Sequence, residues 1–184
     1  MISRKLTAAL AATIAFTGLA LAAENPMVGG APMFADKNIV ENAVNSKDHT
    51  TLVAAVKAAG LVDTLMGPGP FTVLAPVNAA FDALPAGTVD TLLKPENKDQ
   101  LVKVLTCHVI GAEAMSSAIM KMVKDDGGMH KVKTVGGCEL MLKDDGGKIT
   151  ITDETGGVAN VTIADVDQSN GVIHVIDKVL LPKM

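Results

Sequence analysis

The chain has 184 residues, of which 48% are hydrophobic and 2% aromatic, and its formal net charge is −4. The length and the positive mean hydropathy fit one globular domain with a short extension and argue against intrinsic disorder. The acidic charge and the absence of Trp and Tyr argue against a nucleic-acid-binding protein, because the chain offers neither a basic surface nor rings that stack on bases.

Residues 1–22 have the composition of a secretory signal peptide. Arg4 and Lys5 form a basic start, an apolar run follows, and small residues ending at Ala22 offer a cleavage site. The apolar run is short for a bilayer span, and an uncleaved anchor is the alternative. We expect the mature protein to be secreted or periplasmic and to have no membrane span, because no later segment is apolar enough to cross a bilayer.

The first half of the mature chain has helical periodicity. Residues 23–37 show no periodicity, and we expect them to form an irregular lead before a single domain that spans residues 38–183. Asn38 is a suitable start for the first helix, and Gly60 is a suitable end for the second. After a Gly/Pro break, the pattern predicts a short strand over residues 71–75 and further helices over residues 78–84, 88–93, 98–109 and 113–124.

The second half changes to the period of two that is typical of strands. Apolar residues alternate from Val132 to Ile163, and acidic, Gly-rich turns separate the predicted strands. The pair Asn170-Gly171 predicts a two-residue hairpin loop, and residues 172–181 predict a strand buried on both faces. A helix-rich half followed by a strand-rich half predicts an α+β fold.

Two cysteines, Cys107 and Cys138, remain in the mature chain. In an oxidising compartment an even pair predicts a disulfide, which would close a loop of about 30 residues. The alternative is a reactive thiol at Cys107 beside His108. Consecutive residues of a helix point about 100° apart, however, so these two side chains would form a poor pair of nucleophile and base.

Three stretches resemble the fasciclin (FAS1) domain family. Residues 71–81 (FTVLAPVNAAF) resemble its first signature, residues 170–182 (NGVIHVIDKVLLP) resemble its second, and residues 105–110 resemble an intervening segment that usually reads Tyr-His. The resemblance implies one FAS1-like domain, with helices packed beside a twisted, sandwich-like or wedge-like pair of sheets. The motif or structural residues that it singles out are Phe71, Thr72, Pro76, Asn78, Phe81, His108, Asn170, Gly171, His174 and Asp177.

The first signature suggests a strand-to-helix turn inside the core. We expect Phe71 and Phe81 to supply bulky core contacts and Pro76 to preset the backbone of the turn. Val77 stands where Thr or Ser is common in the family, so a hydroxyl cap is missing. We therefore expect Asn78 to cap the helix that follows.

The two signature histidines are expected inside the molecule. A histidine on an apolar face is usually a core residue with satisfied hydrogen bonds, so we expect this of His108 and His174 rather than a metal or catalytic role. We expect His108 to fix the turn near Asn78. In animal relatives the Tyr-His segment is linked to integrin binding, but Cys107 stands where that Tyr is common, so this role is not carried over.

The resemblance implies a non-enzymatic binding module that mediates cell adhesion or another surface or partner interaction, as in secreted single-domain bacterial members of the family. The sequence agrees, since it contains no cofactor motif and no recognisable catalytic constellation. We expect a monomer that binds an unknown protein or a cell-surface or matrix component without a metal or another cofactor. A hydrolase that uses Cys107 or a histidine is a further alternative, which a disulfide at Cys107 would disfavour.

A second function is suggested by the methionines and histidine between residues 115 and 130. Met115, Met120, Met122, Met129 and His130 offer soft ligands for Cu(I), so an extracytoplasmic small-ligand or copper-handling protein is the alternative. The same methionines fit a core role, because Met115 and Met122 share one helical stripe. The Asp-rich turns lack the EF-hand pattern, so we expect solvated turns there and no Ca²⁺ site.

Overall fold

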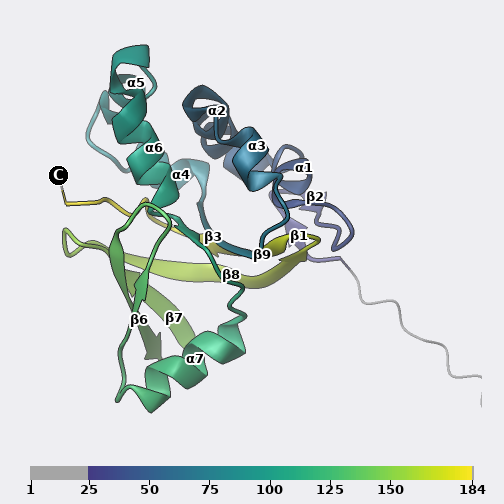
Figure 1. Ribbon diagram of the computed structural model, residues 1–184, viewed down its shortest axis with the longest axis vertical. Coiled ribbons are helices and arrows are strands. Elements are labelled where there is room, and N and C mark those ends of the chain that lie inside the picture. The colour runs from purple at the N-terminus through teal and green to yellow at the C-terminus, as the bar shows by residue number, and fades with distance from the viewer. Residues whose placement is uncertain (1–24, 184) are drawn as a thin grey trace, which may run out of the picture.

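A seven-stranded mixed sheet runs through the part of the chain that the computed structural model describes, residues 25–183 (Figure 1). The signal peptide predicted for residues 1–22 lies outside these residues. Strands β3 and β9 are parallel, and the other neighbours in this sheet are antiparallel. The strands follow the order β4 (Val109–Ile110), β3 (Phe71–Pro76), β9 (Gly171–Ile176), β8 (Val158–Gln168), β7 (Lys148–Thr152), β6 (Glu139–Asp145) and β5 (His130–Lys133).

The long strand β8 bends the sheet into two parts. Its residues 161–168 pair with β9, whereas residues 158–160 pair with β7. The register between β8 and β9 shifts between Val161 and Ile163 and again between Ile163 and Val166. Such irregularities bend a strand and increase its twist. The two parts of the sheet therefore diverge in the wedge-like arrangement that the family resemblance implies.

Helices cover the two parts of the sheet separately (Figure 1). Helix α7 (Ser116–Asp125) packs against β5, β6 and β7, and the remaining helices gather beside β3 and β9. These are α1 (Ile39–Ala43), α2 (Thr50–Ala59), α3 (Val62–Leu65), α4 (Asn78–Asp82), α5 (Thr88–Leu92) and α6 (Lys98–Thr106), with 3-10 turns at Lys47–His49 and Pro95–Asn97. The predicted α+β class is confirmed. Within residues 25–183, no helix has both the length and the apolar character that a membrane crossing requires.

Two hydrophobic clusters fill the space between helices and sheet. The first cluster lies between helices α1 to α6 and strands β3 and β9, and its buried residues include Leu52, Val56, Val73, Phe81, Leu105 and Val175. The second cluster lies between α7 and the strands from β6 to β9, and its buried residues include Ile119, Val123, Leu140, Leu142, Ile149 and Ile151. The sheet thus separates one core from the other.

Two predicted helix ends are confirmed. The Oδ1 atom of Asn38 accepts hydrogen bonds from the amides of Val40 and Glu41, each at 3.0 Å, and the Glu41 carboxylate accepts one from the Asn38 amide at 2.9 Å. This reciprocal capping box starts α1. Gly60 ends α2 with a φ of 73°, a left-handed conformation that glycine adopts without steric cost.

Part of the lead at residues 23–37 forms a regular element, although its sequence has no periodicity. Residues 27–32 form a small hairpin of β1 (Met27–Val28) and β2 (Ala31–Pro32). Val28 and Met33 are buried in the first cluster, 3% and 2% exposed. Two separate apolar side chains are enough to anchor this segment, and such a short pattern has no periodicity to reveal it.

The last hairpin also differs from its prediction. Because Gln168 pairs with Gly171, the two-residue loop is Ser169-Asn170, one residue earlier than expected. Strand β9 ends at Ile176 instead of continuing through the apolar run. Residues 177–183 leave the sheet and are held by side chains of other segments, which an apolar run in the sequence does not indicate.

Two helices differ from their predicted bounds: α6 ends earlier than predicted, and α7 begins later. Helix α6 ends at Thr106, so His108 lies beyond the helix and not on its apolar stripe. Helix α7 begins at Ser116, because its first turn is held by the carboxylate of Asp165, a residue distant in the sequence. Contacts of this kind cannot be found from helical periodicity.

Candidate binding site

The second signature holds three backbone segments together through Asn170. Its Oδ1 accepts a hydrogen bond from the Ile39 amide at 3.0 Å, and its Nδ2 donates to the carbonyl oxygens of Leu65 and Gly67 at 2.8 and 2.9 Å. These bonds tie the β8–β9 loop to the start of α1 and the end of α3. Asn170 is 8% exposed, and both polar atoms of its side chain bond to backbone groups of the protein. Its role is structural.

The next residue, Gly171, is a glycine because the backbone of the neighbouring strand β3 lies very close to it. Its φ is +152°, and a Cβ atom there would lie 2.0 Å from the carbonyl oxygen of Phe71. A side chain at this position therefore collides with strand β3, and the parallel pairing of β3 with β9 requires glycine.

Asn78 caps a different helix from the one predicted. It is the first residue of α4, where Val77 occupies the cap position without a side-chain hydrogen bond. The Asn78 Oδ1 instead accepts from the Thr51 amide at 3.0 Å and from the Thr50 hydroxyl at 3.2 Å, and its Nδ2 donates to the Lys47 carbonyl at 2.8 Å. Asn78 thus caps α2 from a distant part of the sequence, because its side chain points away from α4.

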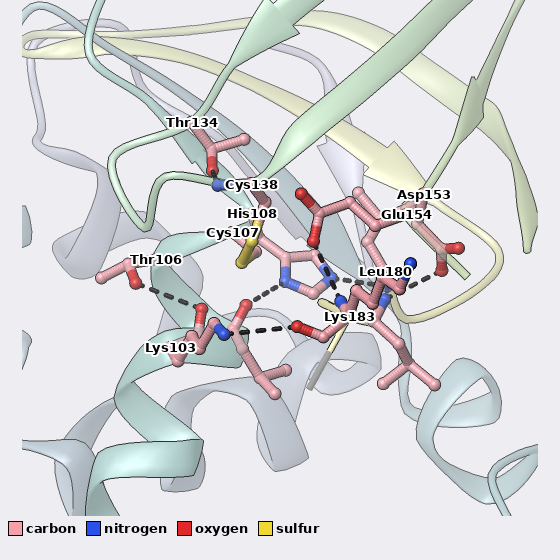
Figure 2. Close-up of a disulfide and its surroundings, with 12 residues drawn as sticks. Lys103, Thr106, Cys107, His108, Thr134, Cys138, Asp153, Glu154, Leu180 and Lys183 are labelled. Carbon is pink, nitrogen blue, oxygen red and sulfur yellow. Dashed lines mark hydrogen bonds between the residues drawn. A yellow bond between two sulfur atoms is a disulfide. The ribbon is translucent and has the colours of Figure 1, made fainter. Parts of the chain in front are cut away.

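His108 is a core residue, as predicted, but it fixes a different segment. Its Nδ1 donates to the Val104 carbonyl at 2.8 Å, and its Nε2 accepts from the Leu180 amide at 2.9 Å (Figure 2). It therefore holds the C-terminal segment and not the turn near Asn78. Burial lowers the pKa of His108 to about 4, so the ring is neutral at pH 7 and its Nε2 is free to accept.

The C-terminal segment is held further by two acidic side chains of the β7–β8 turn. The Asp153 carboxylate accepts from the Leu181 amide, and the Glu154 carboxylate accepts from the Lys183 amide, both at 2.9 Å (Figure 2). Hydrogen bonds from the amides of Glu139 and Lys183 lower the pKa of Glu154. Asp153 was not singled out from the sequence, although an Asp before Thr and two glycines is a typical turn signal.

The predicted disulfide is confirmed, since Cys107 is bonded to Cys138 (Figure 2). It joins the end of α6 to the loop between β5 and β6. The Cys107 sulfur is therefore not a free thiol, and the hydrolase alternative loses its most nucleophilic group.

The second signature histidine organises the start of α7. His174 is fully buried; its Nε2 donates to the Ala114 carbonyl at 2.8 Å, and its Nδ1 accepts from the Asp165 amide at 3.2 Å. Burial lowers the pKa of His174. Thr72, also buried, accepts from the Ala114 amide at 2.9 Å and donates to the Ala112 carbonyl at 2.6 Å. Both signature residues thus fix the segment before α7.

The remaining motif residues also act within the scaffold. Phe81 is 8% exposed in the first cluster, and Phe71 packs against that cluster while half-buried. Pro76 is the last residue of β3. The Asp177 carboxylate accepts from the Asn160 amide and side-chain amide, both at 2.7 Å, and so joins the end of β9 to β8. The motif residues therefore come together as fold-defining contacts and do not form one shared site.

Asn42 is a structural residue that the sequence analysis missed. It is fully buried on α1, donates to the Phe34 carbonyl at 2.8 Å, accepts from the Phe34 amide at 3.0 Å and donates to the Gln168 side chain. A polar residue between the apolar positions of a short helix was the signal that could have found it.

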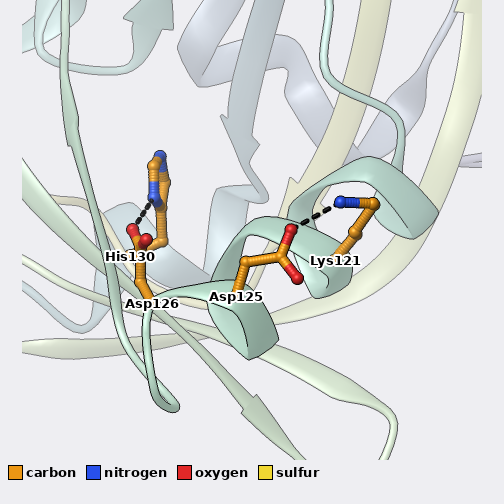
Figure 3. Close-up of polar contacts among 4 residues, drawn as sticks. All are labelled: Lys121, Asp125, Asp126 and His130. Atoms are coloured by element: carbon orange, nitrogen blue, oxygen red, sulfur yellow. Dashed lines mark hydrogen bonds and ion pairs between the residues drawn. The ribbon is translucent and has the colours of Figure 1, made fainter.

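Of the methionines and histidine considered as copper ligands, Met120 and Met122 lie on α7 and His130 begins β5. Met120 and Met122 pack against the second cluster, whereas Met129 is 49% exposed. His130 Nδ1 lies 2.7 Å from an Asp126 oxygen, and Lys121 pairs with Asp125 on α7 (Figure 3). In residues 25–183 no group of three or more His, Cys, Asp or Glu side chains is placed to hold a metal ion. Packing is the role that the structure gives Met120 and Met122.

An apolar groove opens between α1, α2 and α3 on the helical side. Its cavity volume is about 50 Å³. Aliphatic side chains form nearly all of its walls, and Lys57 is the cationic residue among them. The lining residues are Ile39, Val40, Ala43, Leu52, Val53, Val56, Lys57, Leu61, Val62, Leu65, Val73, Leu74, Leu105, His108 and Val109.

A second cavity of about 30 Å³ lies deeper in the same region. It shares Ile39, Ala43, Leu52 and Val73 with the groove, so single side chains separate the two spaces. His49 lines the deeper cavity; its Nδ1 lies 2.8 Å from the Ser46 hydroxyl, and its Nε2 has no hydrogen-bond partner among the described residues. Burial lowers the pKa of His49.

The groove was not predicted from the sequence. In the structure Val40, Val53 and Val62 are half-buried on short helices, and Val44 and Met66, at the ends of α1 and α3, are 48% and 47% exposed. Short helices that carry apolar residues on more than one side leave apolar surface uncovered.

Comparison with known proteins agrees with this architecture. The family model described as "Fasciclin domain" matches residues 47–182. The chain is 44% identical over 172 residues to Protein sll1483 of Synechocystis sp., an alignment that covers 94% of this chain and 88% of that protein. It is 34% identical over 167 residues to the cell surface glycolipoprotein MPB83 of Mycobacterium bovis, covering 88% of this chain and 68% of that protein.

A solved structure of a FAS1 domain pair from the insect cell adhesion molecule Fasciclin I has the same fold. The TM-score is 0.69 at 19% sequence identity, and the match covers 79% of this chain and 51% of that chain. The family match extends over most of the described residues, and both signatures lie inside it. The chain therefore belongs to the fasciclin domain family.

Proposed function

We propose that this chain is a secreted or periplasmic fasciclin-like binding module that mediates cell adhesion or another contact with a surface or partner. The observation that carries the proposal is the likeness of its fold to a FAS1 domain pair of an insect cell adhesion molecule. The identity of 34% to a cell surface glycolipoprotein supports an extracytoplasmic location. The proposed role is non-enzymatic, and the partner is a protein or a cell-surface or matrix component bound by a monomer.

The placement of the motif residues supports a rigid scaffold. Asn170, His108 and His174 use their hydrogen-bonding atoms within the molecule, and the bond between Cys107 and Cys138 joins its two parts. A rigid scaffold presents a contact surface with little loss of conformational entropy on binding. Partner contacts in this proposal therefore come from exposed side chains outside the signatures.

Capture of cells by the immobilised chain tests this function. Beads that carry the folded chain are expected to retain intact cells or envelope and matrix extracts in a saturable way, and excess soluble chain should release them. Beads that carry heat-unfolded chain control for nonspecific adsorption, because their amino-acid composition is identical. Equal retention by folded and unfolded chain, or no retention from any source, would contradict adhesion.

The copper-handling alternative stays a prediction that metal analysis can test. Stoichiometric copper in untagged protein, lost on substitution of Met129 and His130, would support it. No observation in residues 25–183 favours this alternative over packing of the methionines.

A further inference from the structure

We propose that the groove between α1, α2 and α3 binds a single-chain anionic amphiphile, such as a long-chain carboxylate. Its aliphatic chain occupies the groove, and its head group lies at Lys57. This site is separate from the cell or partner contact proposed above and would give the domain a ligand of its own.

The lining selects an aliphatic body. The rim residues Val40, Val53 and Leu61 are half-buried, and the walls below them are aliphatic, with no aromatic ring for stacking. His108, the polar group of the floor, already uses both ring nitrogens within the protein. A cavity lined by apolar groups stays dry, so an alkyl chain that enters meets no bound water to displace.

The dimensions select a linear chain over a bulky ring system. The cavity volume of the groove is about 50 Å³, which is too small for a ring system. The end of an alkyl chain fits such a narrow space, while the rest of the chain lies along the open part against the half-buried valines. The deeper cavity of about 30 Å³ shares Ala43 and Leu52 with the groove and offers room for further methylenes when these side chains shift.

The charge at the mouth selects an anionic head group. Lys57 is one of the residues that line the groove, and it is exposed to solvent. The three ion pairs found in residues 25–183 use other lysines and a histidine, so no acidic side chain in this part of the chain lies within ion-pair distance of Lys57. An ammonium beside an apolar groove matches the two ends of a carboxylate amphiphile, whereas a cationic head group would be repelled.

Binding of dodecanoate to the purified full chain, measured by isothermal titration calorimetry, tests the chemistry. We expect saturable one-to-one binding that weakens about fourfold for each methylene removed. Lys57→Gln should weaken dodecanoate several-fold and leave dodecanol unchanged. Dodecylammonium should bind less tightly than either. Absence of saturable dodecanoate binding, or the same affinity for all three head groups, would overturn the proposal.

A matched pair of variants tests the location. Ala43 is half-buried in the lining, whereas Ala54 is exposed on α2 outside it. Ala43→Phe should abolish dodecanoate binding by filling the groove, and Ala54→Phe should leave it intact. Val53→Gln at the rim provides a milder variant if Ala43→Phe does not fold, and it should weaken binding of dodecanoate and dodecanol alike. Equal binding by all three folded variants would place the ligand elsewhere.

Sedimentation with lipid vesicles distinguishes binding of a free amphiphile from binding to a membrane surface. The chain should not sediment with vesicles that contain anionic phospholipids, because the groove accepts one chain and not a lipid headgroup layer. Sedimentation with such vesicles that Ala43→Phe leaves unchanged would assign the apolar rim to membrane contact and overturn the proposal. These outcomes are independent of cell capture, so failure of either proposal can be recognised without the other.

Discussion

The helical side and the sheet side of this domain are built on different principles. On the sheet side, β5, β6, β7 and β8 follow one another as hairpins. The buried residues Leu140, Leu142 and Ile151, each 2% exposed or less, alternate there with half-buried or exposed residues. On the helical side, helices of four to ten residues are attached by side-chain hydrogen bonds from distant segments. The first side is specified locally, and the second depends on long-range polar contacts.

Packing differs in the same way. Small apolar cavities of about 50, 30 and 20 Å³ are lined mainly by residues of the first cluster, on the helical side, whereas the sheet side has wider and more polar surface hollows of about 750 and 560 Å³ beside α7. Short helices do not cover a sheet continuously. Each of them is too short to be stable alone and is placed by its attachment points. The side with the small apolar cavities is therefore also the side with the apolar groove. The comparison therefore locates both the stabilising residues and the space for a ligand.

The largest effect is expected from removing the attachment point shared by α1 and α3. Asn170→Ala leaves the amide of Ile39 and the carbonyls of Leu65 and Gly67 without their partner, which should lower the free energy of unfolding by about 5 kcal/mol. Urea unfolding measures this loss. Asn97→Ala, which removes one exposed bond to the Thr91 carbonyl, is the control and should cost less than 1 kcal/mol. Similar losses in both variants would contradict the comparison.

Truncating one leucine on each side measures the packing difference directly. Leu140 is 1% exposed in the second cluster, so Leu140→Ala should cost about 4 kcal/mol. Leu52 lines two cavities and has fewer contacts to lose, so Leu52→Ala should cost about 2.5 kcal/mol. Urea denaturation of the two variants under the same conditions gives the difference. A larger loss at Leu52 would show that the cavities do not reflect looser packing.

The disulfide joins the two sides, so its removal tests how far they depend on each other. Cys107 and Cys138 are 31 residues apart, and loss of this cross-link in a Cys107→Ala/Cys138→Ala variant should cost about 3.5 kcal/mol through the entropy of the unfolded chain. If the sheet side is locally specified, its amide protons should stay protected from hydrogen exchange while those of α6 lose protection. Uniform loss across the domain would mean that the two sides unfold as one unit.

Acid should weaken the attachment of the C-terminal segment. The pKa of His108 is about 4 in the folded protein against 6.5 for an ordinary histidine, so the unfolded chain binds a proton before the folded one does. The contribution of His108 to the free energy of unfolding is therefore fully present above pH 6.5. It falls by about 3 kcal/mol as the pH drops toward 4. The lowered pKa values of His49 and His174 act in the same direction. His108→Gln should flatten the profile of unfolding free energy against pH, and parallel profiles would refute this assignment.

The limits of prediction separate local patterns from contacts between segments that are distant in the sequence. The α+β class, the capping of α1 by Asn38, the end of α2 at Gly60 and the disulfide are all visible in local patterns or simple chemistry, and all are confirmed. The partners of Asn78 and His108 were predicted wrongly. Each bonds a segment that no local pattern connects to it: Asn78 the start of α2, and His108 the amide of Leu180.

The groove shows the same limit for a candidate site. It is made from half-buried aliphatic residues of three short helices, such as Val40, Val53 and Val62. Each of these looks like an ordinary core position in the sequence. Whether such residues meet each other or leave a gap depends on how the helices are attached, so the space cannot be found before the fold is known.

The smallest effect is expected from the cap that α4 provides for α2. Asn78→Ala removes the acceptor of the Thr51 amide and the donor to the Lys47 carbonyl, and exposed cap bonds of this kind contribute about 1 kcal/mol. The change should speed hydrogen exchange at Thr51 and in the first turn of α2 and leave the amides of β6 and β7 unaffected. Asn45→Ala, which removes an exposed bond to the Glu41 carbonyl, is the control and should leave α2 unchanged. If exchange in the strands increased as much as in α2, the helical side would not be a separately attached unit, because a defect at one cap would then reach residues that share no contact with it.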